Sequence, residues 1–173
     1  MKYFLAALFV LTKAAFLVFI FGVLAHYFVV TVFRISGESM LPNLEHGNFI
    51  LVSRASYFWK EPQRFDVIGF AFPGDQKRQK FVKRIIGLPN EKVEIKESKV
   101  FINQKELTEN YLTNEKTEPD ASFGLAKDEF FVLGDNRDNS YDSRFFGPLD
   151  KRFIIGKAAT VIFPLDKLGF LIY

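Results

Sequence analysis

Two side chains in this chain have the type and surroundings for acyl transfer by a serine and a lysine. Ser39 lies between Gly37 and Pro42, where a long apolar segment ends and a strand-rich part begins. Lys83 lies beside Arg84 inside an otherwise apolar stretch. A serine among turn formers is most often only a turn residue, so neither stretch is informative alone. Together they suggest a serine nucleophile and a lysine base at a membrane surface.

A lysine acts as a base only in surroundings that favour its neutral form. A free lysine has a pKa near 10.4 and is charged at neutral pH. Lowering that pKa to ~7–8 takes on the order of 4 kcal/mol, which burial away from water and carboxylates can supply. After the apolar segment, Lys83 and Lys157 are the lysines embedded in apolar strands. We interpret Lys157 as a strand lysine whose amine reaches solvent, and Lys83 as the candidate base.

Other chemical classes fit this sequence less well. A Ser-His-Asp enzyme needs a histidine base, but His26 lies in the apolar segment and His46 follows the serine by only seven residues. Leu41 stands where a G-x-S-x-G elbow has its second glycine. The chain has no cysteine, which excludes disulfides, thiol catalysis and cysteine metal sites. The net charge of +3 comes from dispersed lysines and arginines, so nucleic acid is not expected as the main partner.

A third stretch, residues 134–147, combines turn formers with paired charges. A solvated loop is the default interpretation, and a calcium loop is the alternative. Counted from Asp138, however, the sixth position of such a loop is Ser143 instead of glycine, and the twelfth is Leu149 instead of glutamate. We therefore expect no metal ion, and we expect no cofactor.

Residues 1–33 are predicted to form an amino-terminal tail and a single transmembrane anchor. The piece from Ala14 to Phe33 is 20 residues long, which is enough to cross a bilayer core of ~30 Å. A cleavable signal peptide is the competing interpretation, but the apolar run far exceeds a core of roughly 7–15 residues. Residues 28–35 are rich in β-branched side chains and could leave the helix as a strand.

The charges that flank the anchor give a weak prediction of its orientation. Lys2 and Lys13 on the amino side of the anchor favour a cytoplasmic amino terminus, whereas Arg34 on the other side favours the opposite orientation. The expected location is therefore the cytoplasmic membrane, with the catalytic domain on the outer face.

Residues 34–173 are predicted to form a single mainly β domain. Short strands with turn punctuation are expected at residues 48–53, 66–72, 128–133 and 153–163. Val93 and Ile95 alternate with charged residues, as do Val100 and Ile102, and this pattern predicts a hairpin. Residues 97–127 are interpreted as a variable connection.

The three stretches, in this order and behind an apolar anchor, resemble bacterial type I signal peptidase in its short Gram-positive-like form. Residues 39–42 resemble the nucleophile box of that family, residues 83–89 its lysine box, and residues 134–147 its third box. The resemblance implies a compact β-rich catalytic domain of the signal-peptidase type. It also implies a membrane-bound serine endopeptidase that uses a Ser-Lys dyad to remove signal peptides from exported preproteins.

Carried over position by position, the resemblance implies roles for individual residues. Ser39 would be the nucleophile, Lys83 the general base, and Ser140 the residue that orients the lysine amine. Two structural ion pairs would hold the third box against the lysine strand, Arg84 with Asp135 and Asp142 with Arg144. Four residues would line the substrate pockets and strand walls: Phe33, Ile35, Phe81 and Val82.

The family binds a signal peptide as an added extended strand, with small residues selected at positions −1 and −3. The backbone N–H of Ser39 would be one oxyanion donor, but Gly37 leaves the second donor open. Asn43 and the pair Asn90-Glu91 depart from the family pattern, which puts the turn geometry in question. Near the bilayer, Met40, Leu41 and Trp59 could contact lipid.

Two alternatives remain open on the sequence. One is a specialised peptidase that processes a single protein of a conjugation or pilus system. The other is a membrane-anchored β domain that binds extended peptides without cutting them, although such a binder has no need of a buried lysine.

Overall fold

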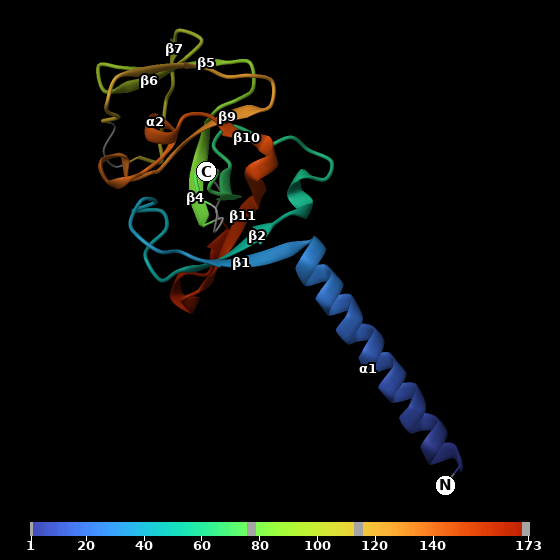
Figure 1. Cartoon of the computed structure of the whole chain (residues 1–173). Coiled ribbons are helices and arrows are strands. Elements are labelled where there is room, and N and C mark those ends of the chain that lie inside the picture. The colour runs from blue at the N-terminus through green and yellow to red at the C-terminus, as the bar shows by residue number, and fades with distance from the viewer. Residues whose placement is uncertain (1, 76–78, 113–115, 171–173) are drawn as a thin grey trace.

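The protein consists of one long helix and a domain built from two antiparallel sheets (Figure 1). We describe it from a computed structural model, which covers residues 2–75, 79–112 and 116–170. The mainly β fold predicted from the sequence is confirmed. After the first helix, the longest helix in the described residues is α2, Ser143–Phe146, with four residues.

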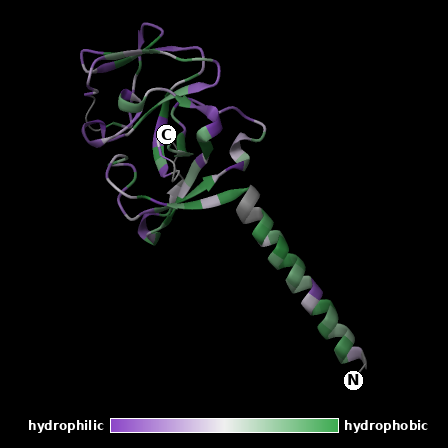
Figure 2. Cartoon of the chain, viewed as in Figure 1, coloured by the Kyte–Doolittle hydropathy of each residue, from purple (hydrophilic) through white to green (hydrophobic). Residues whose placement is uncertain are grey.

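Helix α1, Lys2–Phe28, projects away from the β domain (Figure 1). Its segment Tyr3–Leu24 spans 22 residues and is long and apolar enough to cross a membrane. All of these side chains are exposed, and Figure 2 shows hydrophobic residues along nearly the whole helix. Lys13 does not interrupt the helix, and its Nζ lies 4.4 Å from the centre of the Phe9 ring.

The sheet begins earlier in the sequence than the predicted boundary at residue 33. Strand β1, Val30–Arg34, follows α1 after a single residue. The cause is local, because Val29, Val30, Thr31 and Val32 are all β-branched and favour an extended backbone. The predicted strand-like exit from the helix is therefore confirmed, and it places residues 30–33 in the sheet instead of the anchor.

The large sheet has eight strands in the order β1-β2-β11-β3-β4-β9-β10, with β12 paired to β11. Every pairing in it is antiparallel. After β1, its strands are β2 Phe49–Ser53, β3 Val67–Ala71, β4 Lys80–Gly87, β9 Glu129–Leu133, β10 Leu149–Asp150, β11 Ile154–Phe163 and β12 Gly169–Phe170. The order brings β4, which carries Lys83, between β3 and β9.

The small sheet has the order β7-β6-β5-β8. Its strands are β5 Lys92–Lys96, β6 Lys99–Ile102, β7 Lys105–Glu106 and β8 Ala121–Gly124. The predicted hairpin is confirmed, since Val93 pairs with Ile102 and Ile95 with Val100. Its turn residues Glu97 and Ser98 both have positive φ, 52° and 61°, as a two-residue turn that matches the strand twist requires. The connection 97–127 contains three strands of this sheet, namely β6, β7 and β8.

Short 3-10 turns complete the domain. They are η1 Ala55–Tyr57, η2 Arg137–Asn139, η3 Lys151–Phe153 and η4 Leu165–Lys167. The turn η1 lies beside the exit of α1, because the backbone N–H groups of Arg54 and Ala55 both donate to the carbonyl of Val29.

The core consists of three apolar clusters, and one of them lies directly below the serine loop. Met40 is only 1% exposed and packs there with Phe33, Ile35, Leu44 and other residues. The expectation that Met40 contacts lipid is therefore wrong, because its side chain anchors the loop in the core. Trp59, by contrast, is 87% exposed.

A second cluster joins the two sheets and generates a stability prediction. Phe131 of β9 is fully buried in it, and its ring centre lies 5.0 Å from that of Phe123 of β8. We expect Phe131→Ala to lower the free energy of unfolding by about 3–5 kcal/mol through lost burial and a cavity. Denaturant unfolding in detergent micelles measures this. The control Phe58→Ala, at an exposed position, should change it by less than about 0.5 kcal/mol, and equal losses in both variants would contradict the assignment.

Candidate active site

The loop that carries Ser39 connects β1 to β2 and is held at both ends. Gly37 adopts φ +98°, a conformation that favours glycine, and its N–H donates to Nδ1 of His46 at 3.1 Å. The side chain of Met40 is buried under the turn. The result is a fixed turn that presents Ser39 at the edge of a groove. His46 is thus a hydrogen-bond partner of the loop, which agrees with its rejection as a base.

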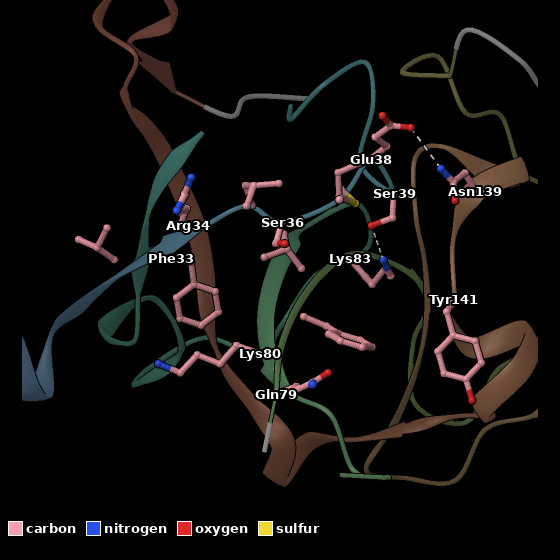
Figure 3. Close-up of a pocket in the computed structure, with 16 residues that line it drawn as sticks. Phe33, Arg34, Ser36, Glu38, Ser39, Gln79, Lys80, Lys83, Asn139 and Tyr141 are labelled. Carbon is pink, nitrogen blue, oxygen red and sulfur yellow. Dashed lines mark hydrogen bonds between the residues drawn. The ribbon is translucent and has the colours of Figure 1, made fainter. Parts of the chain in front are cut away.

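Lys83 lies in the middle of β4 and is only 4% exposed. Its neighbour across the sheet is Ile68 of β3. Its Nζ lies 2.5 Å from Ser39 Oγ (Figure 3), a contact between residues 44 positions apart. Burial lowers the pKa of Lys83 from 10.5 to about 8, a difference that corresponds to roughly 3 kcal/mol. The fold therefore brings a weakly basic amine into contact with the serine hydroxyl.

Nearby charges modify the effect of burial on Lys83. The carboxylates of Asp142 and Asp135 raise the pKa of the lysine, whereas the guanidinium of Arg144 lowers it. Both carboxylates are engaged by arginines, because Asp135 accepts two hydrogen bonds from Arg84 at 2.8 and 2.7 Å and Asp142 accepts from Arg144 at 2.8 and 2.9 Å. Desolvation outweighs the attraction of the two carboxylates, so the pKa stays low.

The second embedded lysine is not a candidate base. Lys157 of β11 is 40% exposed, and its Nζ lies 2.5 Å from Asp66 Oδ1. Its amine therefore reaches solvent, as expected, but it also forms an ion pair that the sequence did not predict. Asp66 in turn accepts from the hydroxyl of Tyr57 at 2.9 Å, which fixes the turn η1 against the sheet.

The ion pair of Arg84 with Asp135 joins β4 to the third stretch, residues 134–147. Both side chains are 1% exposed. Asn43 donates to the same carboxylate at 2.8 Å, and the ring of Tyr111 lies 4.1 Å from the guanidinium carbon of Arg84. Asn43, one of the departures from the family pattern, therefore connects the serine loop to this ion pair.

The other departure, Asn90-Glu91, also has a clear local role. Asn90 has a positive φ of 65°, which asparagine tolerates in turns. Glu91 accepts from the backbone N–H of Leu88 at 2.7 Å and pairs with Arg64 at 2.6 Å. The side chain of Glu91 thus closes the turn that follows β4, and Arg64 holds that side chain in place.

The second expected ion pair does not reach the lysine strand. Asp142 and Arg144 are both in the third stretch, and Asp142 also accepts from the N–H of Gly134 at 3.0 Å. Arg144 donates to the carbonyls of Glu118 and Arg137 at 2.5 and 2.8 Å. The expectation that this pair clamps the third stretch to β4 is therefore corrected. The pair holds the third stretch together, because its two members are only two residues apart, and Arg144 also ties that stretch to the connection at Glu118.

Ser140 lies beside Gly134 behind the serine loop. A Cβ at Gly134 would lie 2.2 Å from Ser140 Oγ and 2.5 Å from the backbone oxygen of Ser39. Ser140 Oγ is buried and has no hydrogen-bond partner within residues 2–75, 79–112 and 116–170. The expected bond to Lys83 is therefore not formed here, where the lysine amine contacts Ser39.

Sequence reasoning missed two groups that support the site. The N–H of Asn136 donates to the backbone oxygen of Ser39 at 3.0 Å. Arg137 is buried and binds Glu109 at 2.6 Å, which ties the third stretch to the connection. Asn136 and Arg137 lie in a stretch already singled out, but Glu109 had no signal, since it stands in a polar segment with many similar residues.

A groove with a volume of about 710 Å³ passes in front of the serine and the lysine (Figure 3). One wall comes from residues 32–40 and the other from residues 79–83, with Asn139 and Tyr141 beside them. The four residues expected to contact substrate all line it, namely Phe33, Ile35, Phe81 and Val82. The fold thus places the reactive pair in a groove between two extended backbone segments.

Comparison with known proteins identifies the family of this chain independently of the geometry. The family model for signal peptidase, peptidase S26, matches residues 8–163. The chain belongs to this family. It is 41% identical to signal peptidase I of Leptolyngbya laminosa over 82% of this chain and 73% of that protein. It is 34% identical to signal peptidase I P of Bacillus subtilis subsp. natto over 90% of this chain and 89% of that protein.

A solved structure shares the fold of this S26 chain. The crystal structure of a signal peptidase I from Enterococcus faecalis V583 matches with a TM-score of 0.51 and 36% sequence identity. The match covers 57% of this chain and 97% of that chain. The family and the single apolar helix together indicate a membrane-anchored serine endopeptidase.

The charges around the lysine of this S26 chain predict opposite shifts in two variants. Arg144→Gln removes a positive charge that lowers the pKa of Lys83, so that pKa should rise above about 8. Asp142→Asn removes a negative charge that raises it, so the pKa should fall. The pH dependence of Lys83 modification by an amine-directed reagent, located by mass spectrometry, measures both. Near-UV circular dichroism checks the fold, and shifts in the same direction would contradict the electrostatic assignment.

Gly134 generates a second prediction, on the geometry of the serine loop. A methyl group there collides with the backbone of Ser39, so Gly134→Ala should displace the serine from Lys83. A displacement of about 1 Å can cost about 10²-fold in rate, which a peptide-cleavage assay measures. The matched control is Gly124→Ala, since nothing lies within 4 Å of a Cβ at Gly124. Full activity in Gly134→Ala would show that the close approach is not needed.

Proposed function

We propose that this protein removes signal peptides from exported preproteins, with Ser39 as the nucleophile and Lys83 as the general base. The observation that carries the proposal is the 2.5 Å contact between Ser39 Oγ and the buried Nζ of Lys83. Family membership supports the reaction class. Relatives named signal peptidase I support the choice of substrate.

The chemistry follows from a neutral amine beside a hydroxyl. Ser39 Oγ attacks the carbonyl carbon of residue −1 while Lys83 Nζ takes the hydroxyl proton. The C–N bond then breaks, and the proton on the lysine passes to the departing amine, which is the new amino terminus of the mature protein. Lys83, neutral again, takes a proton from water, and the resulting hydroxide attacks the ester carbonyl. The bond between the carbonyl carbon and Ser39 Oγ then breaks, the signal peptide leaves with a free carboxyl group, and the proton on Lys83 returns to Ser39 Oγ.

The backbone N–H of Ser39 is the first oxyanion donor in this proposal. It makes no hydrogen bond to any group in the part of the chain that the structure describes, so it can donate to the developing oxyanion. Gly37 has no side-chain donor to add, and the second donor stays open.

Ser140 acts on the lysine after acylation. Once Ser39 Oγ is esterified, the amine of Lys83 loses the contact it has in the free enzyme. Ser140 Oγ lies against the same glycine as the backbone of Ser39 and has an unused hydrogen-bonding capacity. We infer that it then orients the amine towards the attacking water.

The substrate binds as an extended strand between β1 and the first half of β4. Backbone pairing supplies affinity in this mode, and pockets for alternate side chains supply specificity. Phe33 and Ile35 on one wall are 5% and 6% exposed, and Phe81 and Val82 on the other are partly buried. Bulky neighbours leave shallow pockets, and small residues at −1 and −3 fit them.

The domain lies on the outer face of the cytoplasmic membrane, and its lipid-facing surface adjoins the anchor. Backbone hydrogen bonds tie the start of η1 to Val29 at the exit of α1. Trp59 follows that turn, is 87% exposed and packs edge-on against Phe58. Exposed tryptophan beside a membrane exit suits the interface between lipid and water.

The decisive test uses a preprotein with alanine at −3 and −1 and the full chain in detergent micelles. Ser39→Ala and Lys83→Ala should each reduce cleavage to background, because one removes the nucleophile and the other removes the base. Lys157→Ala is the matched lysine control and should keep activity. Substantial cleavage by Lys83→Ala would refute the assignment of Lys83 as the general base.

In the unmodified protein kcat/KM should rise with pH through about 8, as the neutral form of Lys83 appears.

Neither alternative gains support from the comparisons. The relatives named above are signal peptidases, and none of them is a specialised conjugation or pilus peptidase. A domain that only binds peptides gives no reason for the contact of Ser39 with a buried lysine.

A further inference from the structure

Glu38, the residue before the serine, lies on the groove at its catalytic end. Its side chain is exposed and lines the groove. Its carboxylate accepts a hydrogen bond from Asn139 Nδ2 at 3.3 Å, and Figure 3 shows this contact directed away from Phe33 and Lys80, beyond the serine. The carbonyl of Glu38 also accepts from Asn136 Nδ2 at 3.2 Å. The carboxylate thus has a defined position beside the reacting group.

The charged side chains along the groove differ between its two ends. Arg34 and Lys80 lie at the end near Phe33, whereas Glu38 lies at the end near Ser39, beside the buried Lys83 (Figure 3). Glu38 is the only acidic residue among the described residues that line the groove. In the part of the chain that the structure covers, no lysine or arginine forms a salt bridge with it. Its charge is therefore available to a bound chain.

The anchor determines which end of the groove receives the signal peptide. Strand β1 begins two residues after α1 ends and runs from Val30 towards Ser39. A signal peptide has an apolar segment that precedes its cleavage site, and that segment lies in the same membrane as α1. The peptide must therefore enter at the Phe33 end and reach Ser39 with its residue −1. The first residues of the mature protein then leave the groove past Glu38 and Asn139.

We propose that Glu38 is a specificity-determining residue for the first two positions of the mature protein, +1 and +2, where it favours lysine or arginine over aspartate or glutamate. The inference rests on the proposed function, since it concerns the leaving side of the same cleavage reaction. Asn139 holds the carboxylate in place. A cationic side chain at +1 or +2 gains attraction to Glu38, and an anionic one is repelled. Because Glu38 is exposed, the preference is modest, about two- to fivefold per charge.

The test uses three internally quenched peptides that share an apolar segment and alanine at −3 and −1. They carry two lysines, two glutamines or two glutamates at +1 and +2. With the full chain in detergent micelles, kcat/KM should fall in that order. Glu38→Gln should bring the three values together, Glu38→Lys should reverse the order, and high salt should weaken the preference of the unmodified protein.

Two controls assign the effect to this carboxylate and to this side of the bond. Asp138→Asn removes a neighbouring carboxylate that lines a different cavity, and the order of the peptides should persist. The same three residue types placed at −5 should give ratios that Glu38→Gln does not change. A loss in Asp138→Asn as large as that in Glu38→Gln, or an unchanged order in Glu38→Gln, would overturn the proposal.

The glutamine peptide separates failure of this inference from failure of the proposed function. If the unmodified protein does not cleave it, or if Ser39→Ala still does, the peptidase assignment itself is wrong. If the protein cleaves all three peptides equally and Ser39→Ala cleaves none, only the role of Glu38 is refuted.

Discussion

The structure depends on one constraint, which is that an amine must stay buried beside a hydroxyl without attracting a compensating charge. A buried lysine normally recruits a carboxylate, and that partner would raise its pKa and keep it protonated. Asp135 and Asp142 lie near enough to act on Lys83, but each is bound by an arginine at hydrogen-bonding distance. The guanidinium of Arg144 also lowers the pKa of Lys83, and burial outweighs the attraction of the two carboxylates. The ion pair of Asp142 with Arg144 therefore has an electrostatic effect on the site as well as a structural one.

The ion pair of Asp135 with Arg84 explains why three distant stretches must be positioned together. Asp135 binds Arg84 of the lysine strand and Asn43 of the serine loop, so one carboxylate holds both halves of the reactive pair. Gly134 leaves room for both the backbone oxygen of Ser39 and the hydroxyl of Ser140, which lie 2.5 and 2.2 Å from where its Cβ would stand. A side chain at that position, or the loss of that carboxylate, would separate groups whose useful distance range is a few tenths of an ångström.

The position of the anchor relative to the groove gives the site its direction. Strand β1 continues from α1 with only one residue between them, and it forms one wall of the groove. The apolar helix and one wall of the groove are therefore parts of one continuous segment. In the binding mode proposed above, a substrate anchored in the same bilayer would meet the groove from the end near α1, and this would set the polarity of the bound chain. With that direction, the opposite charges at the two ends of the groove would face different parts of the proposed substrate.

Elements that depend on local properties could be predicted from the amino-acid sequence alone. An apolar run of membrane length, the β-branched exit at residues 29–32, and the alternation of Val93 and Ile95 with charged residues are each sufficient to predict an anchor, a strand and a hairpin. The three stretches around Ser39, Lys83 and Asp135 were also recognisable by their residue types and order. How these stretches contact one another became clear from the three-dimensional arrangement of the chain. It showed that the expected pair of Asp142 with Arg144 stays within one stretch, that Met40 is buried, and that Glu109 reaches Arg137. Such contacts depend on how the folded chain places residues in space. The pattern along the sequence does not tell which of several similar polar residues will meet.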